Sequence, residues 1–128
     1  MSTPDQKNLT KSILILEDDE MISEIYKKQL EKAGYEVEVV IEGSHVAEKI
    51  KKEEPDLALL DLLIPGGGGI EILKQLEGWN GKTKNVIFSN SQDEESEKEA
   101  LSLGASAFFI KANYTPSQLL GEIKKLLS

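Results

Sequence analysis

The sequence predicts an α/β fold in which a doubly wound, five-stranded parallel sheet carries helices on both faces. Two observations predict it: five short apolar runs alternate with five segments of helical periodicity, and 128 residues is the length of one ordinary domain. A crossover between parallel strands must be right-handed and long enough to hold a helix, so this alternation indicates parallel pairing. The common order for five such strands is 2-1-3-4-5.

The apolar runs give the expected strands. These are Ser12–Leu16, Tyr35–Ile41, Leu57–Leu60 (continuing into Asp61), Val86–Phe88 and Ala107–Ile110. The intervening segments have apolar residues at helical spacing, with Gly34 as an expected helix stop and Pro55 closing the second helix. The apolar residues that mark the helices are Ile22, Ile25, Tyr26, Leu30 and Ala33, then Val46, Ala47 and Ile50, then Ile70, Leu73 and Leu76, and finally Leu119, Leu120, Ile123, Leu126 and Leu127. The fourth helix is expected over residues 92–103, with acidic first turns that complement the helix dipole.

Composition excludes several classes of protein. Hydrophobic residues make up 39% and charged residues 30% of the chain, which is typical of a soluble globular protein and not of a disordered one. The net charge of −8 argues against direct binding to nucleic acid. The longest apolar stretch, Leu57–Ile64, is too short to cross a membrane, and the polar N-terminus has no signal-peptide core. The absence of cysteine suits the cytoplasm. We expect residues 1–10 to be a flexible tail and residues 11–128 to form the domain.

Polar and charged residues stand where this fold predicts a site. In a doubly wound sheet the crevice lies beyond the carboxyl ends of the strands that flank the switch point, here the first and third strands. Those ends carry the acidic run Glu17–Glu20 and the carboxylate of Asp61. Ser89 follows the fourth strand and Lys111 follows the fifth. Carboxylates, a hydroxyl and an ammonium are therefore expected to meet at one edge of the sheet.

Crowded carboxylates need a compensating cation. Two of them 4 Å apart repel by about 4 kcal/mol at an effective dielectric of about 20. Lys111 supplies one positive charge, and Mg²⁺, which prefers carboxylate oxygens and retains several waters, would supply more. The alternative for Asp19 and Glu20 is that they only cap the helix that follows. That alternative is weak for Asp61, because an acid ending an apolar strand is partly desolvated.

Four segments together resemble the response regulator receiver domain. They are ILILEDDE, LALLDLLIPGGGG, VIFSN and GASAFFIK, in this order along the chain. The resemblance extends from about residue 11 to residue 127 and implies the flavodoxin-like (βα)5 fold with strand order 2-1-3-4-5. It is carried by the order and spacing of the four segments, since no single motif is decisive.

The resemblance also implies roles for individual residues. Asp61 corresponds to the phosphoacceptor, Lys111 to the lysine of the site, Ser89 to the switch hydroxyl and Phe108 to the switch aromatic. The implied magnesium-binding residues are Glu17, Asp18, Asp61 and Leu63, the last through its backbone carbonyl. Counting back from the first helix places the acidic pair on Glu17 and Asp18, but a slip of one residue, which would bring in Asp19, stays open.

The implied function is that of a phosphoacceptor signalling module. Asp61 would take a phosphoryl group from a sensor histidine kinase or a histidine phosphotransfer protein, with Mg²⁺. The face of helix four, strand five and helix five would then switch toward a downstream protein target. The protein is expected to be a stand-alone, chemotaxis-regulator-like receiver, a monomer or a phosphorylation-dependent dimer, cytoplasmic and without membrane contact. It would not be an enzyme beyond catalysing its own phosphorylation and dephosphorylation.

Several residues depart from the family pattern. Ala112 stands where the family usually has a proline after a cis bond, so a trans bond is expected. Ala112 and Asn90 favour the alternative function, a receiver-fold binding or scaffold domain that signals without phosphorylation. Leu63, two residues after Asp61, has no polar side chain that could orient an attacking water, and the other position that flanks the site holds only Ser91. We therefore expect slow hydrolysis of phosphorylated Asp61. Residues Gly66–Gly69 form a run of glycines, and Gly69 is expected to have a special backbone angle.

Overall fold

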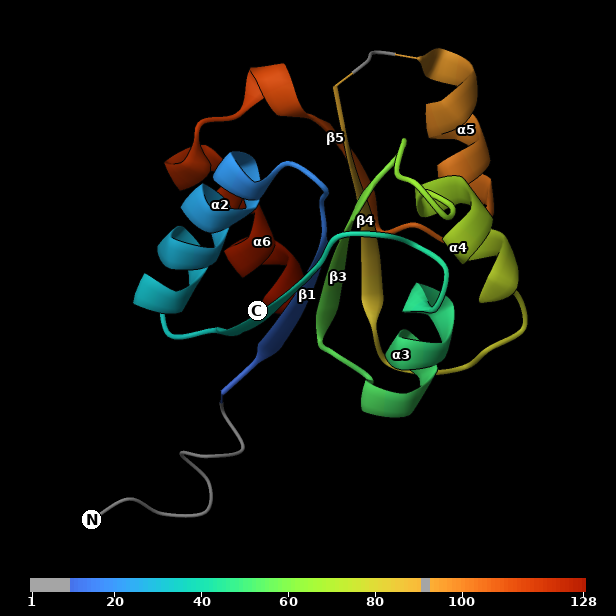
Figure 1. The fold of residues 1–128 in the computed structure, drawn as a ribbon, viewed down its shortest axis with the longest axis horizontal. Helices are drawn as coiled ribbons and strands as arrows, with labels where there is room; N and C mark the ends of the chain where they lie inside the picture. Colours follow the sequence, from blue (N-terminus) through green and yellow to red (C-terminus); the bar gives the residue numbers. More distant parts are fainter. Residues whose placement is uncertain (1–9, 91–92) are drawn as a thin grey trace.

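A computed structural model describes residues 10–90 and 93–128, which form a single sheet with helices on both faces (Figure 1). All strand pairs are parallel and the strand order is β2-β1-β3-β4-β5, so the predicted fold and the 2-1-3-4-5 order are confirmed. The strands are β1 Ser12–Leu16, β2 Glu36–Val40, β3 Leu57–Asp61, β4 Lys84–Ser89 and β5 Ala107–Ile110.

The helices divide between the two faces of the sheet. They are α2 Glu20–Lys32, α3 Val46–Glu53, α4 Gly69–Gln75, α5 Glu94–Ser102 and α6 Pro116–Leu127, with a short 3-10 turn, η1, at Lys111–Asn113. Helices α2 and α6 cover one face, while α3, α4 and α5 cover the other (Figure 1). Across residues 10–90 and 93–128, none of these helices combines the length and apolar character needed to span a bilayer.

The core consists of two apolar layers, one on each side of the sheet. Because side chains alternate along a strand, odd-numbered residues of β1 and β3 such as Ile15 and Leu59 pack toward α2 and α6. Their even-numbered neighbours, such as Leu16 and Leu60, pack toward α3, α4 and α5. Residues of β3 are buried on both faces, which explains why the strand reads as an uninterrupted apolar run ending in an acid.

Element boundaries differ from the sequence prediction by one or two residues. Strand β4 begins at Lys84 instead of Val86, because Lys84 and Asn85 pair with the first residues of β3. Strand β2 is one residue shorter at each end than Tyr35–Ile41. Helix α5 begins at Glu94, where Asp93 caps it by accepting a hydrogen bond from the backbone N–H of Glu95. The predicted tail over residues 1–10, apart from Thr10, lies outside the described residues, as does Ser91.

The prediction that Gly69 has a special backbone angle was wrong. Within the run Gly66–Gly69, the residues with left-handed backbone angles are Gly66 and Gly67, at φ +84° and +118°. Gly69 has no such angle and is the first residue of α4. A Cβ there would lie 2.4 Å from Cδ1 of Ile87, so what Gly69 provides is close packing of α4 against the sheet. As expected, no peptide bond is cis within the described part of the chain, including the one between Lys111 and Ala112.

Candidate functional site

A cavity of about 200 Å³ lies at the carboxyl ends of the strands. It is lined by Glu17, Asp18, Asp19, Ile22, Asp61, Leu63, Ser89, Asn90 and Lys111. The structure therefore gathers every predicted catalytic and metal-binding residue around one space. Phe108, the predicted switch aromatic, does not line the cavity: it is half-buried on the other face of the sheet, against the α3–α5 layer.

Strand alternation explains why these side chains converge. Glu17 is two residues after Ile15 of β1, Asp61 is two residues after Leu59 of β3, and Lys111 is two residues after the last buried aromatic of β5. Each side chain therefore follows the row that faces α2 and α6, just where the apolar layer ends. Burial is consequently high, with Glu17 only 4% and Asp61 only 8% exposed.

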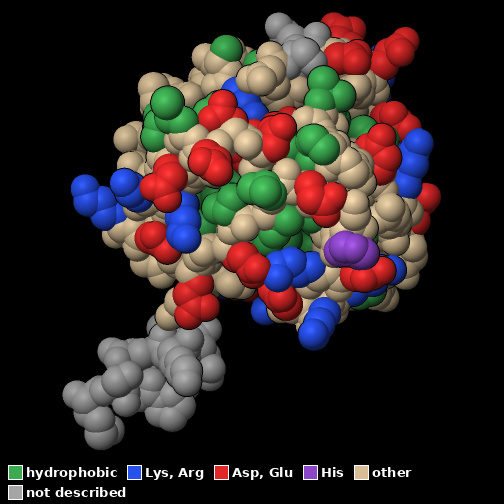
Figure 2. Space-filling model, in the orientation of Figure 1, with side chains coloured by type: hydrophobic (Ala, Val, Ile, Leu, Met, Phe, Trp, Pro, Cys, Tyr) green, Lys and Arg blue, Asp and Glu red, His purple; other side chains and the backbone are tan. Residues whose placement is uncertain are grey.

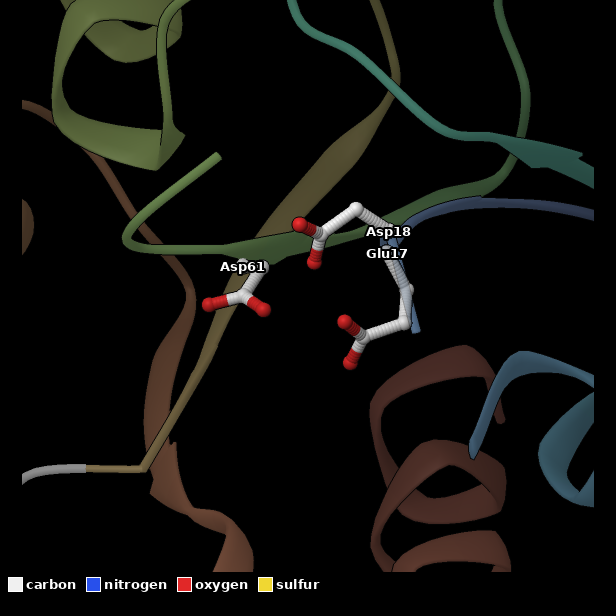
Figure 3. A group of neighbouring side chains, drawn as sticks. All are labelled: Glu17, Asp18 and Asp61. Carbon is white, nitrogen blue, oxygen red and sulfur yellow. The ribbon is translucent and has the colours of Figure 1, made fainter. Parts of the chain in front are cut away.

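Three carboxylates form a compact group in the cavity. Glu17, Asp18 and Asp61 each offer an oxygen, and these oxygens all lie within 4.8 Å of one another. Figure 3 shows the Asp61 carboxylate at the end of β3 turned toward the two carboxylates that follow β1. Hard divalent cations such as Mg²⁺ prefer ligands of this kind. The set of donors fits Mg²⁺, and the exposure of Asp18 leaves room for metal-bound waters.

Lys111 supplies the protein's own cation at the site. Its Nζ donates hydrogen bonds to Oε1 of Glu17 at 2.5 Å and to Oδ2 of Asp61 at 2.9 Å, and its side chain is 8% exposed. Burial by itself lowers the pKa of Lys111, because it disfavours the charged form. The hydrogen bonds to the two carboxylates outweigh burial, so the pKa of Lys111 lies above its ordinary value and the ammonium stays charged.

For Glu17, burial outweighs the hydrogen bonds in setting the pKa. Burial raises the pKa of Glu17, and neither the hydrogen bond from Lys111 nor the one from the backbone N–H of Asp19 fully offsets it. The charge of Asp61 raises the pKa of Glu17 a little further. Burial of Glu17 therefore outweighs the stabilisation that Lys111 gives to its charged form.

The local geometry distinguishes Asp19 and Glu20 from the acids that are grouped with Asp61. The side chain of Asp19 is the N-cap of α2, accepting a hydrogen bond from the backbone N–H of Ile22 at 3.1 Å, and Glu20 lies in the first turn of that helix. Glu17 and Asp18 are the acids grouped with Asp61. The grouping matches the predicted pair, and the helix-capping interpretation holds for Asp19, whereas Glu20 is the first residue of α2.

Ser89 and Leu63 line the cavity together with Asp61. Ser89, the last residue of β4, is buried and lines the cavity. The backbone N–H of Leu63 donates to Oδ1 of Asp61 at 3.3 Å, while the Leu63 side chain is 81% exposed. The Leu63 backbone is thus held beside Asp61, although its side chain points into solvent.

Sequence reasoning missed two aromatic residues beneath Lys111. The Lys111 ammonium lies 5.5 Å from the centroid of the Phe88 ring, and the ring of Tyr26 meets that of Phe88 nearly edge-on, at 5.3 Å and 86°. Strand alternation could have revealed Phe88, because it lies two residues after Val86 on β4 and faces the same layer as Val86 and Leu59. The contact with Tyr26 of α2 depends on tertiary packing.

Comparison with known proteins agrees with this site. Residues 13–124 match the response regulator receiver domain family. The chain is 32% identical over 120 residues to the alkaline phosphatase synthesis transcriptional regulatory protein PhoP of Bacillus subtilis, covering 93% of this chain and 49% of PhoP. It is 31% identical over 118 residues to the phosphate regulon transcriptional regulatory protein PhoB of Rhizobium meliloti, covering 90% of this chain and 51% of PhoB. It therefore spans about half the length of these relatives.

Solved structures give the same result. A CheY-like response regulator receiver domain protein from Methanospirillum hungatei superposes with a TM-score of 0.84 at 33% identity, covering 92% of this chain and 94% of the other. The BeF3-activated N-terminal receiver domain of Klebsiella pneumoniae RstA superposes with a TM-score of 0.81 at 30% identity, covering 91% and 98%. Fold, site and relatives agree, and the chain belongs to the response regulator receiver domain family of two-component systems.

Proposed function

We propose that this receiver domain accepts a phosphoryl group on Asp61, with Mg²⁺, and signals in the cytoplasm through protein contacts. The donor would be a sensor histidine kinase or a histidine phosphotransfer protein. The observation that carries the proposal is the placement of Asp61 at the rim of a cavity, with an ammonium at 2.9 Å and two further carboxylates beside it. The domain would catalyse only its own phosphorylation and dephosphorylation.

The chemistry follows from the residues around Asp61. A carboxylate oxygen of Asp61 attacks phosphorus in line, and a new P–O bond forms. The bond from phosphorus to the donor atom breaks, and its electron pair leaves with the donor. Lys111 donates hydrogen bonds to the phosphoryl oxygens while Glu17 continues to hold its ammonium. The backbone N–H of Leu63 helps to orient the Asp61 carboxylate.

The residues that would hold Mg²⁺ are Glu17, Asp18 and Asp61, with the backbone carbonyl of Leu63. Bound Mg²⁺ would neutralise charge on the phosphoryl oxygens, so that an anionic donor can approach an acidic site. Without it, the donor would meet three carboxylates and a single ammonium. Asp61 would therefore serve both as a metal ligand and as the phosphoryl acceptor.

The signal would leave through the face formed by α5, β5 and α6. The hydroxyl of Ser89 would turn to hydrogen-bond the bound phosphoryl group, which frees space for Phe108 to move inward from its half-buried position. The partner would be a protein, contacted by a monomer or by a phosphorylation-dependent dimer. The net charge of −8 argues against direct binding of nucleic acid by this domain, and on the face shown in Figure 2 acidic side chains are interspersed with basic ones.

Intact mass spectrometry tests the proposal. The protein is treated with phosphoramidate and Mg²⁺, and we expect one phosphoryl adduct that is absent in Asp61→Asn and strongly reduced in EDTA. Asp93→Asn is the matched control, because asparagine also caps a helix and Asp93 lies at the start of α5, outside the cavity lining. A wild-type protein that forms no adduct, or an Asp61→Asn protein that still forms one, contradicts the proposal and favours a scaffold that signals without phosphorylation.

A further inference from the structure

We propose that Phe88 is a positioning residue for Lys111, holding its ammonium between Glu17 and Asp61 through a cation–π contact. This inference rests on the proposed phosphorylation of Asp61. It assigns part of the phosphorylation rate to the ring of Phe88, which would contact neither the phosphodonor nor the metal. Phe88 acts only through Lys111.

The ammonium of Lys111 contacts two carboxylates and one aromatic ring. Hydrogen bonds to Glu17 and Asp61 hold the ammonium on the side of the carboxylates. The face of Phe88 lies 5.5 Å from Nζ, within the range in which the ring quadrupole attracts a cation. Because the Lys111 side chain is almost fully buried, water screens this attraction little.

The ring itself is firmly held. Phe88 is 3% exposed and stands directly beside Asp61 in the pairing of β3 with β4. Tyr26 of α2 packs against it almost perpendicularly, with ring centroids 5.3 Å apart. A ring braced from the sheet and from a helix can fix the position of a flexible lysine side chain, which has a four-carbon stem.

The backbone at Lys111 is part of a short turn. Lys111 begins the short turn η1, and Ala112, the next residue, has no ring to fix the backbone. Tyr26 and Phe88, together with Glu17 and Asp61, help to line a void of about 10 Å³, which is at the lower limit of what one water needs. A smaller residue at position 88 would enlarge this void, admit water and let the ammonium drift from Asp61.

The decisive experiment separates the charge distribution of the ring from its volume. Phe88 is replaced site-specifically by pentafluorophenylalanine, which keeps the shape of the ring but removes the negative potential of its face. Phe88→Leu removes the ring. Val86→Ala is the control, because Val86 lies two residues before Phe88 on the same face of β4 and is fully buried. Rates of adduct formation with phosphoramidate and saturating Mg²⁺ are measured by intact mass, and folding is checked by urea unfolding.

We expect the fluorinated protein and the Phe88→Leu variant to react roughly three- to tenfold more slowly than wild type, and Val86→Ala to react at the wild-type rate despite lower stability. A fluorinated protein that reacts as fast as wild type overturns the inference, and so does an equal loss of rate in Val86→Ala. Absence of any adduct on the wild-type protein overturns the proposed function, and this inference with it. If the wild-type protein forms the adduct and the fluorinated protein forms it equally fast, the inference about Phe88 is overturned but the proposed function stands.

Discussion

The ammonium of Lys111 lies 2.9 Å from Oδ2 of Asp61, joining the end of β5 to the end of β3 across the intervening strand β4. The same ammonium reaches Glu17 after β1, so one buried cation connects three strand ends. Carboxylates that would otherwise repel are held together by this charge. The behaviour of several variants depends on it and on the packing that positions it.

Removal of this charge should weaken both phosphorylation and folding. In Lys111→Met we expect adduct formation on Asp61 to slow by about tenfold or more, because a donor to the phosphoryl oxygens is lost. We expect the free energy of unfolding to fall by about 3 kcal/mol at neutral pH, because the buried carboxylates lose their partner. Intact mass and urea unfolding measure the two effects. Lys125→Met, on the exposed side of α6, is the control; equal behaviour of both variants would refute the role of Lys111.

Magnesium should stabilise the fold through the three-carboxylate group. A ligand that binds only the native state adds about 2.7 kcal/mol to the free energy of unfolding at a concentration about 100 times its Kd. We expect this gain in wild type and a much weaker dependence on Mg²⁺ in Asp18→Asn, with EDTA removing the effect. Urea unfolding across a Mg²⁺ series provides the measurement. A dependence that is unchanged in Asp18→Asn would place the metal elsewhere.

Asp56, at the opposite end of β3, should make stability depend on pH. Burial tends to raise the pKa of Asp56, but the backbone N–H of Ser12 at 2.8 Å and the ammonium of Lys82 at 3.3 Å outweigh it, and the pKa lies below its ordinary 3.8. The folded pKa is the lower one, so this stabilisation is present above pH 3.8 and is lost as the pH falls through the folded pKa.

Asp56→Asn should therefore lower the free energy of unfolding by about 1 kcal/mol at neutral pH, and the difference from wild type should shrink below about pH 4. Urea unfolding at a series of pH values measures it. Glu77→Gln, an exposed acid after α4, should show no such difference. A constant difference between Asp56→Asn and wild type at all pH values would show that charge is not the cause.

The lifetime of the phosphorylated protein should be long, and Leu63 should be one reason. The Leu63 side chain is exposed at the cavity rim and offers no polar group to orient an attacking water. We expect Leu63→Asn to shorten the half-life of phosphorylated Asp61 several-fold with little change in stability. Decay is followed by intact mass after removal of the donor, in Mg²⁺. Half-decay of the wild-type protein within seconds would show the prediction to be wrong.

Two glycine substitutions should change stability in opposite directions. A Cβ on Gly68 would lie 1.9 Å from the backbone oxygen of Leu62, so Gly68→Ala must shift the loop beside Asp61 and should cost about 1–3 kcal/mol. A Cβ on Gly121, within α6, meets nothing within 4 Å, so Gly121→Ala should stabilise by about 0.5–1 kcal/mol. Urea unfolding of both variants checks the pair. Stabilisation by Gly68→Ala would contradict the packing of this loop.

Much of the fold was predictable because its signals are local. Strands such as Ser12–Leu16 and Ala107–Ile110 have the predicted boundaries, since an apolar run ended by a charged or polar residue is a complete description of a buried strand. Boundaries were wrong where pairing decided them: Lys84 and Asn85 lack an apolar pattern and belong to β4 only because β3 lies beside them. The reason for Gly69 was missed similarly, because Ile87, which its Cβ would strike, comes from another strand.

The sequence by itself determined the alternation of elements and the set of residues at the carboxyl edge of the sheet, because apolar periodicity and an acid at the end of a strand are properties of neighbouring residues. The strand order was predicted from the order that is common for such folds and from the family resemblance. Only the tertiary structure decided which of those side chains touch. That Lys111 bonds both Glu17 and Asp61, and that its ammonium lies over the ring of Phe88, which Tyr26 contacts, depends on strand register and helix packing. Contacts between residues 50 to 94 positions apart arise from burial of the shared core, which local patterns do not encode.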